Sequence, residues 1–359
     1  MKNLYILIFL FLFIPINVFG LSTTASSSIL MDMDSGRILY SKDIHNPRLI
    51  ASITKIMTAT LAIENGNLEE VVEVGEEVLT MYGSNIYITL GEKMTLKDLL
   101  YGLLLRSGND AAIVIATHIA GSEEKFVEMM NKKAREIGML NTTYKNCHGL
   151  DEVTENYSTA YDMAVLSSYA NTLEVYREIS STKKWTTSSD IKSYVWYNRN
   201  KLLTSYQYAT GGKTGYTPRA GRTLVTSASR NGLNLTAVTL NDPNEYISHE
   251  NMYEYGFNNY NNYLIIDKDN FDIDDSFYKD EVYINNSFSY PLTKNELENT
   301  SSMVRLYKLN GYKDGDKVGE VIVRLNDKEI FRENVYVKTS NSKISFFEKI
   351  KNFFKVVFD

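Results

Sequence analysis

Residues 51–58 read Ala51-Ser52-Ile53-Thr54-Lys55-Ile56-Met57-Thr58 and place a serine and a lysine inside an otherwise apolar segment. The segment extends over residues 50–64, and its apolar side chains recur at the spacing of a largely buried helix. On a helix, Ser52 and Lys55 are three residues apart and share one face. The hydroxyl and the amine can therefore come within hydrogen-bonding distance.

The pairing of Ser52 with Lys55 has a chemical consequence. Burial penalises the charged form of an amine, and a second cation nearby penalises it further. A neutral amine can act as a general base that activates a serine hydroxyl where no histidine is available. The segment therefore predicts a nucleophilic serine with a lysine base. Taken alone, Ser-x-x-Lys also fits an ordinary helix start with a surface lysine.

Two further short motifs follow along the chain, Ser107-Gly108-Asn109 and Lys213-Thr214-Gly215. The first interrupts two apolar helices, which we predict over residues 96–106 and 111–120. Each motif alone is weak, and the significance lies in their order and in the residues around them.

Strands are predicted at both ends of this helical region. Residues 29–41 read as a hairpin around a Gly-containing turn. Residues 222–229 and 233–240 read as a second hairpin around Arg230-Asn231-Gly232, a strong turn signal. Short strands separated by Asn, Asp and Gly then predict a small all-β domain over residues 264–338. Helices between early and late strands indicate an α+β fold.

The composition excludes several classes of function. The chain has 359 residues, a formal net charge of −6 and one cysteine, Cys147. At roughly 150 residues per domain, this length predicts about two domains plus tails. The acidic balance lacks the basic surface that binds a phosphate backbone, so we expect no nucleic-acid partner. The four histidines and the cysteine are scattered, so we expect no metal site.

Taken together, the motifs resemble a known set. Ser-x-x-Lys, Ser-x-Asn and Lys-Thr-Gly occur in penicillin-binding proteins and class A β-lactamases. The flanking residues are similar to those of low-molecular-weight penicillin-binding proteins, the serine-type D-alanyl-D-alanine carboxypeptidases, over roughly residues 25–263. The stretches that carry the resemblance are residues 51–58, Ser107-Gly108-Asn109-Asp110-Ala111-Ala112, His148-Gly149-Leu150, Ser158-Thr159-Ala160 and Gly212-Lys213-Thr214-Gly215-Tyr216-Thr217.

The resemblance implies a β-lactamase/transpeptidase-like domain, an antiparallel sheet flanked by helices, over residues 21–263. It also implies the chemistry. Ser52 would attack the carbonyl between the two terminal D-alanines of a peptidoglycan stem peptide and form an acyl-enzyme. Lys55 would take the serine proton, and Ser107 would help pass a proton to the departing D-alanine. No cofactor is implied, and β-lactam antibiotics would be covalent inhibitors.

The remaining implied site residues bind the substrate. Asn109 would hydrogen-bond the peptide backbone, while Lys213 and Thr214 would hold the terminal carboxylate from an exposed strand that faces the nucleophile. Lys213 would also supply the second cation that keeps the base neutral. The backbone N–H groups of Ser52 and Tyr216 would meet the oxyanion.

The two ends predict an exported protein. Residues 1–20 contain an apolar run too short to span a bilayer, which indicates a signal peptide that is removed rather than an anchor. Residues 343–359 place phenylalanines at helical spacing opposite lysines, after a polar linker at 339–342. This pattern predicts an amphipathic helix lying on the outer face of the cytoplasmic membrane. Alternatively, the helix packs on its own domain or on a partner.

Residues outside the three motifs also have expected roles. We expect His148 to be structural and Cys147, where the family commonly has proline, to be a packed thiol. Arg199 fits structural support and substrate contact equally well. The spacing of Glu152 and Asn156 imitates the pair that holds the hydrolytic water in class A β-lactamases, which we interpret as coincidence because the flanks match the carboxypeptidases.

Three alternatives to a carboxypeptidase stay open on sequence alone. The fold also supports a β-lactamase, a D,D-endopeptidase that cuts cross-links, and a catalytically inactive scaffold that binds the cell wall. The presence of every motif residue disfavours the scaffold.

Overall fold

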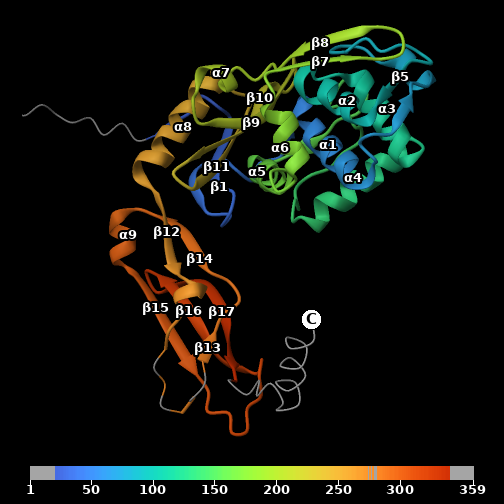
Figure 1. Cartoon of the computed structure of the whole chain (residues 1–359). Coiled ribbons are helices and arrows are strands. Elements are labelled where there is room, and N and C mark those ends of the chain that lie inside the picture. The colour runs from blue at the N-terminus through green and yellow to red at the C-terminus, as the bar shows by residue number, and fades with distance from the viewer. Residues whose placement is uncertain (1–20, 274, 276, 279–280, 340–359) are drawn as a thin grey trace, which may run out of the picture.

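The structure of the chain is a computed structural model that describes residues 21–273, 275, 277–278 and 281–339. The predicted signal peptide and terminal helix lie outside these residues. Figure 1 shows a larger part that contains a sheet and most of the helices, and a smaller β part that extends away from it. Within the described residues, no helix is long and apolar enough to cross a membrane.

A five-stranded antiparallel sheet forms the centre of the larger part, with the strand order β2-β1-β11-β10-β9. Its strands are β1 (Ser27–Asp32), β2 (Ile38–Lys42), β9 (Ala209–Thr217), β10 (Gly221–Arg230) and β11 (Leu233–Leu240). Both predicted hairpins are confirmed, as β1–β2 and β10–β11. Strand β9, which carries Lys213-Thr214-Gly215, lies at one edge of the sheet.

Both faces of this sheet are buried. Neighbouring residues of a strand point to opposite faces, and Ile29 and Leu30 accordingly belong to different hydrophobic clusters. The Leu30 face packs against Tyr253 and Phe257 of α8 (Glu245–Asn259). The Ile29 face packs against the helices between β2 and β9, so the sheet lies between α8 and those helices (Figure 1).

The helices on the Ile29 face include those predicted from sequence. The predicted helix over residues 50–64 is confirmed, although its first turn is a 3-10 turn, and the helix predicted over 96–106 ends in a π-helical turn. In chain order, the helices and helical turns between β2 and β9 are η1 (Ala51–Thr54), α1 (Lys55–Asn65), η2 (Glu76–Thr80), α2 (Leu96–Tyr101), the π turn η3 (Gly102–Arg106), α3 (Asn109–Ala120), α4 (Glu123–Glu136), α5 (Ala160–Ala170), α6 (Glu174–Ser181) and α7 (Leu202–Ser205).

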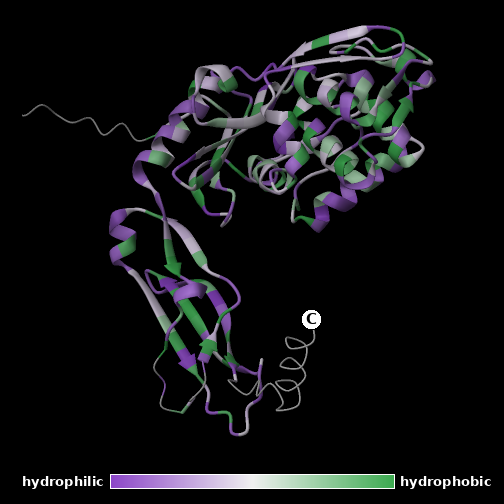
Figure 2. Cartoon of the chain, in the orientation of Figure 1, coloured by the Kyte–Doolittle hydropathy of each residue, from purple (hydrophilic) through white to green (hydrophobic). Residues whose placement is uncertain are grey.

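Helix α4 covers the outside of this group. It buries only Phe126, Met130 and Ala134, which recur every four residues and so lie along one stripe. The remaining surface is hydrophilic, as Figure 2 shows in purple. Three short strand pairs complete the larger part: β3 (Arg48–Leu49) with β6 (Tyr157–Ser158), β4 (Val71–Glu73) with β5 (Lys93–Thr95), and β7 (Lys184–Ser188) with β8 (Ser193–Tyr197).

The smaller part has a hydrophobic cluster of its own, which is built from valines of its central strands and includes Val321, Val323 and Val335. Its main sheet has the order β13-β17-β16-β15 and is joined by the pair β12-β14. The bounds are β12 (Asn261–Ile266), η4 (Lys268–Asn270), β13 (Glu281–Tyr283), β14 (Phe288–Leu292), α9 (Lys294–Glu298), β15 (Thr300–Leu306), β16 (Lys317–Leu325) and β17 (Lys328–Lys338). A boundary at residue 263 stays a prediction.

One arginine joins the two parts. Arg37, in the turn between β1 and β2, donates to the carbonyl oxygen of Pro291 and forms an ion pair with Glu296. Its guanidinium also lies 5.3 Å from the ring centre of Tyr260 and 5.1 Å from that of Tyr290. The ion pair is mostly shielded from solvent, so it is screened by salt less than a surface pair.

Replacing Arg37 by Met should loosen the connection between the two parts. The change leaves Glu296 and the Pro291 carbonyl without their donor, which costs about 1–3 kcal/mol. Limited proteolysis should then cut faster around residues 259–263. The matched control is Arg332→Met, which removes an exposed arginine that pairs only within the smaller part. Equal cleavage rates in the two variants would contradict the role of Arg37.

Candidate active site

The centre of the site is the amine of Lys55, whose side chain is fully buried. Ser52 lies in η1 and Lys55 begins α1, so the predicted three-residue spacing brings Nζ to 3.1 Å from Ser52 Oγ. Nζ also lies 2.7 Å from Oδ1 of Asn109 and 2.5 Å from the carbonyl oxygen of His148. Residues from three separate parts of the sequence therefore meet at one nitrogen.

The environment of Lys55 favours a neutral amine. Burial lowers the pKa of Lys55 to about 7, and the positive charge of Arg199 acts in the same direction. A neutral amine has two hydrogens and one lone pair. The Asn109 oxygen and the His148 carbonyl can accept the two hydrogens, which leaves the lone pair for the hydroxyl of Ser52. The geometry thus suits proton transfer from Ser52 to Lys55.

The backbone before Ser52 is held in an unusual conformation. Ala51 has a φ of 50°, a left-handed value that non-glycine residues seldom adopt. The preceding carbonyl, of Ile50, accepts a hydrogen bond of 2.9 Å from the buried hydroxyl of Thr223 on β10. This contact fixes the turn that presents Ser52 against the central sheet.

Two glycines allow other backbone segments to approach this turn. A Cβ atom on Gly149 would lie 2.0 Å from the carbonyl oxygen of Ala51. A Cβ atom on Gly215 of β9 would lie 3.0 Å from the backbone nitrogen of Ser52. Any larger residue at either position would push these segments apart. The edge strand therefore lies directly against the backbone of the serine.

The middle motif is positioned by a change in helix geometry. The π turn η3 ends at Ser107, which has a left-handed conformation with φ 66° and ψ 36°. Helix α3 then begins at Asn109, whose N–H donates to the carbonyl of Ser84 at 2.7 Å. The amide Nδ2 of Asn109 donates to the carbonyl of Tyr82 at 2.7 Å, which turns Oδ1 towards Lys55.

Lys213 differs from its prediction in its exposure. The side chain is only 1% exposed rather than lying on an open strand, because Gly215 holds β9 against η1 and Lys213 turns inward. Its Nζ donates to the carbonyl of Thr214 at 2.7 Å. Burial, followed by the charges of Lys55 and Arg199, holds the pKa of Lys213 well below its usual value. Lys55 and Lys213 therefore each disfavour the charged form of the other, and the charge of Arg199 acts on both.

The loop that supports Arg199 and Asn109 was not predicted. Arg199 donates to Oγ of Ser84 at 2.9 Å, and Ser84 also supplies the carbonyl that accepts the Asn109 N–H. The buried carboxylate of Asp110 accepts the N–H groups of three loop residues, Ile86, Tyr87 and Ile88. Asp110 directly follows a motif and could have been suspected, whereas Ser84 has no sequence signal.

Open pockets lie on both sides of Ser52. The first, here the Arg199 pocket, has a volume of about 480 Å³ and is lined by Ser52, Ser84, Ser107, Asn198, Arg199, Lys201, Thr214, Gly215, Tyr216, Arg222, Thr223, Glu245 and Tyr246. The second, here the Glu152 pocket, has a volume of about 420 Å³ and is lined by Ser52, Tyr82, Gly83, Ser84, Asn109, Gly149, Leu150, Asp151, Glu152, Tyr216, Thr217, Pro218 and Arg219. Tyr216, 62% exposed, borders both.

The structure therefore brings all seven predicted site residues together. Ser107, Thr214 and Tyr216 border the same pocket as Ser52. Lys55 and Asn109 are linked to Ser52 by the short contacts at Nζ, and Lys213 lies beneath the strand that forms the pocket wall. Among the described residues, no group of three or more acidic, His or Cys side chains could hold a metal ion.

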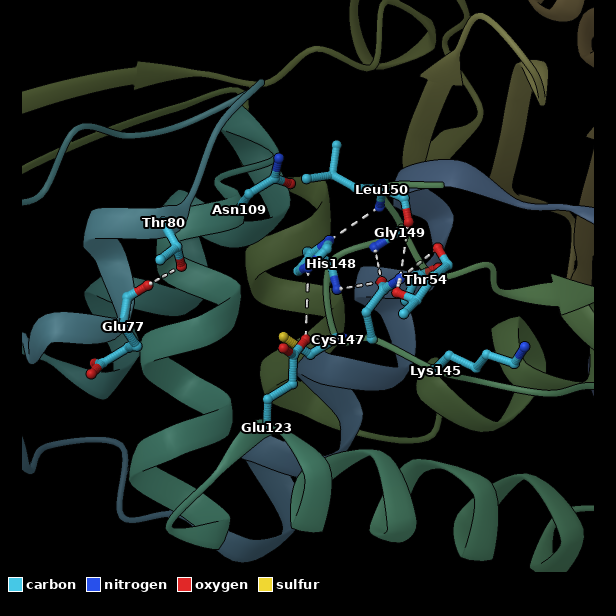
Figure 3. Close-up of polar contacts among 12 residues, drawn as sticks. Thr54, Glu77, Thr80, Asn109, Glu123, Lys145, Cys147, His148, Gly149 and Leu150 are labelled. Carbon is cyan, nitrogen blue, oxygen red and sulfur yellow. Dashed lines mark hydrogen bonds and ion pairs between the residues drawn. The ribbon is translucent and has the colours of Figure 1, made fainter. Parts of the chain in front are cut away.

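His148 and Cys147 are packed rather than open to the pockets beside Ser52. Burial lowers the pKa of His148 to about 3, so its ring is neutral, and Nδ1 accepts the N–H of Leu150 at 3.1 Å (Figure 3). Cys147 is fully buried, as expected. His148 is a structural residue, but its backbone carbonyl contacts Lys55, which sequence reasoning missed. The amide of Asn156 is occupied by Thr54 and Asn146.

Replacing Gly149 by Ala should destabilise the protein more than the same change at Gly138. Both glycines have a φ near +88°, so alanine is strained at either position by about 1–3 kcal/mol. A Cβ on Gly138 meets no atom within 4 Å, whereas on Gly149 it collides with Ala51. We expect Gly149→Ala to lose about 1–3 kcal/mol more in free energy of unfolding, measured in urea. Equal losses would show that the close approach is unimportant.

The sequence and fold match known proteins over most of the chain. The family model described as D-alanyl-D-alanine carboxypeptidase, Peptidase S11, matches residues 17–244. The D-alanyl-D-alanine carboxypeptidase DacC of Escherichia coli is 31% identical, covering 98% of this chain and 94% of that protein. DacF of Bacillus subtilis is 38% identical, covering 61% of this chain and 57% of that protein.

Solved structures agree with this assignment. Penicillin binding protein 5 from Haemophilus influenzae is 28% identical, with a TM-score of 0.75 over 89% of this chain and 97% of that structure. Penicillin binding protein 6B from Escherichia coli is 26% identical, with a TM-score of 0.72 over 89% of this chain and 97% of that structure. The larger part thus has the transpeptidase-like α+β fold that was predicted, followed by a β part. On these matches, and with the three motifs gathered around one serine, the chain belongs to the Peptidase S11 family of D-alanyl-D-alanine carboxypeptidases.

Proposed function

We propose that this protein removes the terminal D-alanine from peptidoglycan stem pentapeptides through an acyl-enzyme on Ser52. The observation that carries the proposal is the buried amine of Lys55, 3.1 Å from the serine hydroxyl and with a pKa lowered to about 7. A serine hydroxyl is a weak nucleophile at neutral pH, and a neutral amine at this distance is the base that it needs.

During acylation, one proton moves from Ser52 to Lys55 and then to the departing amine. Lys55 takes the Ser52 proton as Oγ bonds to the carbonyl carbon between the two D-alanines. The oxyanion is met by the backbone N–H groups of Ser52 and Tyr216. The carbon–nitrogen bond breaks as a proton from Lys55 reaches the departing amine through Ser107. Water then attacks the carbonyl carbon of the acyl-enzyme while Lys55 again takes a proton as base. The bond to Ser52 Oγ breaks as Lys55 returns the proton to the serine, and the product leaves.

The Arg199 pocket is suited to the leaving D-alanine because its carboxylate would enter among cations. In the free protein, Lys213 has no anionic partner among the described residues, and its pKa is low. A carboxylate beside Thr214 and Lys213 would favour the protonated lysine, so binding would be coupled to proton uptake. Arg199, whose charge faces the same pocket, would add to this attraction.

The expected location follows from the sequence. The predicted signal peptide at residues 1–20 and the predicted amphipathic helix at 343–359 support an exported protein that lies peripherally on the outer face of the cytoplasmic membrane. There it would meet peptidoglycan stem peptides, and β-lactams would acylate Ser52 because they imitate the D-alanyl-D-alanine end.

Fluorescent penicillin should label the purified protein once per molecule, and Ser52→Ala should abolish labelling. Ser302→Ala, an exposed serine in β15, should label normally. A chromogenic cephalosporin should give a single stoichiometric burst, because the acyl-enzyme that it forms is long-lived. Sustained rapid turnover would instead identify a β-lactamase, and labelling of Ser52→Ala would overturn the role of this serine.

Acylation should rise with pH and level off above about pH 7, because only the neutral form of Lys55 accepts a proton and its pKa is lowered to about 7. Arg199→Gln removes a cation that lowers this pKa, so the rise should move to higher pH. Lys55→Arg, which stays protonated, should slow acylation about 10²–10⁴-fold. Stopped-flow acylation by a fluorescent β-lactam measures these rates, and a pH-independent rate would contradict a lysine base.

A further inference from the structure

The two pockets beside Ser52 differ in charge. The Arg199 pocket is lined by three cations, Arg199, Lys201 and Arg222, and by one carboxylate, that of Glu245. The Glu152 pocket is lined by two carboxylates and one cation, Arg219. The site is therefore polarised along its length, with the positive end on the side of the leaving carboxylate.

The cation in the Glu152 pocket is already neutralised. Arg219 forms an ion pair with Glu155 and donates to the backbone carbonyl of Asp151. The Asp151 carboxylate is itself buried and accepts the hydroxyl of Thr217 at 2.6 Å. Neither residue is therefore free to bind a ligand of opposite charge.

Glu152 differs from these two residues. Its side chain is exposed to the pocket, and within the described residues it forms no ion pair. It faces Tyr82, which is 41% exposed, and the pKa of the Tyr82 phenol is raised by partial burial and then by the charge of Glu152. The Tyr82 hydroxyl hydrogen-bonds Glu152, but among the described residues no cation pairs with this carboxylate.

The Glu152 pocket continues outward. A larger pocket of about 640 Å³ shares Tyr82 and Leu150 with it and is also lined by Glu123, Glu124 and Lys145. His148 also lines this pocket, and Figure 3 shows it in contact with Glu123 and Leu150. Because the ring of His148 is neutral, it does not offset the acidic side chains there. The larger pocket thus has two carboxylates against one cation, Lys145, so the excess of negative charge in the Glu152 pocket continues into it.

We propose that Glu152 selects substrates in which the residue before D-alanyl-D-alanine carries a free ammonium group on its side chain. This inference rests on the proposed function, which places the two D-alanines across Ser52 and the rest of the peptide in the Glu152 pocket. The ammonium pairs with the Glu152 carboxylate and lies against the ring of Tyr82. The substrate thus presents a negative end and a positive side chain to the two oppositely charged pockets.

The selection has a consequence for the order of reactions. Acyl transfer that cross-links stem peptides converts such an amine into an amide and removes its charge. The enzyme would therefore prefer stem peptides whose amine has not yet been acylated. It would act before the cross-linking reaction at that residue rather than after it.

Two peptides test the selection directly. Nα-acetyl-L-lysyl-D-alanyl-D-alanine has a free ε-ammonium, whereas the Nα,Nε-diacetyl peptide is identical except that the charge is absent. Release of D-alanine gives kcat/KM for each. We expect the wild type to favour the free amine about 3- to 10-fold, mainly through KM, since the contact lies away from the reacting bond. The preference should fall as salt is added.

Substitution then assigns the effect to one carboxylate. Glu152→Gln should bring the ratio close to one by slowing only the free-amine peptide. Glu128→Gln, which removes an exposed carboxylate of α4 that does not line the pockets, should keep the wild-type ratio. A wild type without preference, or a preference that survives Glu152→Gln, would overturn the selection. If neither peptide releases D-alanine, the proposed function itself fails.

Discussion

The structure depends on removing one amine from water. Lys55 is buried at the start of α1, where two acceptors from distant segments, the side-chain oxygen of Asn109 and the backbone carbonyl of His148, are fixed beside it. Burying a lysine is unfavourable unless the amine is neutral or fully hydrogen-bonded. The surrounding segments meet this requirement, because they supply acceptors for two hydrogens and place the Ser52 hydroxyl at the third position.

Much of the rest of the larger part supports this arrangement. The sheet holds the turn before Ser52 through Thr223, and the glycines at positions 149 and 215 allow two backbone segments to approach it. Asp110 fixes the loop that carries Ser84, and Ser84 in turn holds Asn109 and Arg199. The free-energy cost of burying Lys55 and of the strained turn before Ser52 is thus offset by contacts from the neighbouring segments, as is common at sites that store strain.

The sequence predicted the hairpins of the central sheet and the proximity of Ser52 and Lys55, because both depend on local patterns. Two hairpins were visible from turn residues, and the spacing of Ser52 and Lys55 already implied their contact. The inward position of Lys213 was not predicted, because whether a strand residue points outward or under the strand depends on packing against η1. Ser84, and the carbonyl of His148, could not be predicted, since backbone acceptors and lone loop serines have no sequence signature.

The hairpin of β1 and β2 not only forms part of the central sheet but also, through Arg37, holds the smaller part. The smaller part extends away from the larger one and ends where the chain continues towards its C-terminus (Figure 1). The amide of Asn262 adds a second contact, because it donates to the carbonyl of Gly232 in the turn between β10 and β11. An arginine that lines neither pocket thus helps to fix the direction in which the pockets beside Ser52 face relative to the long axis of the smaller part.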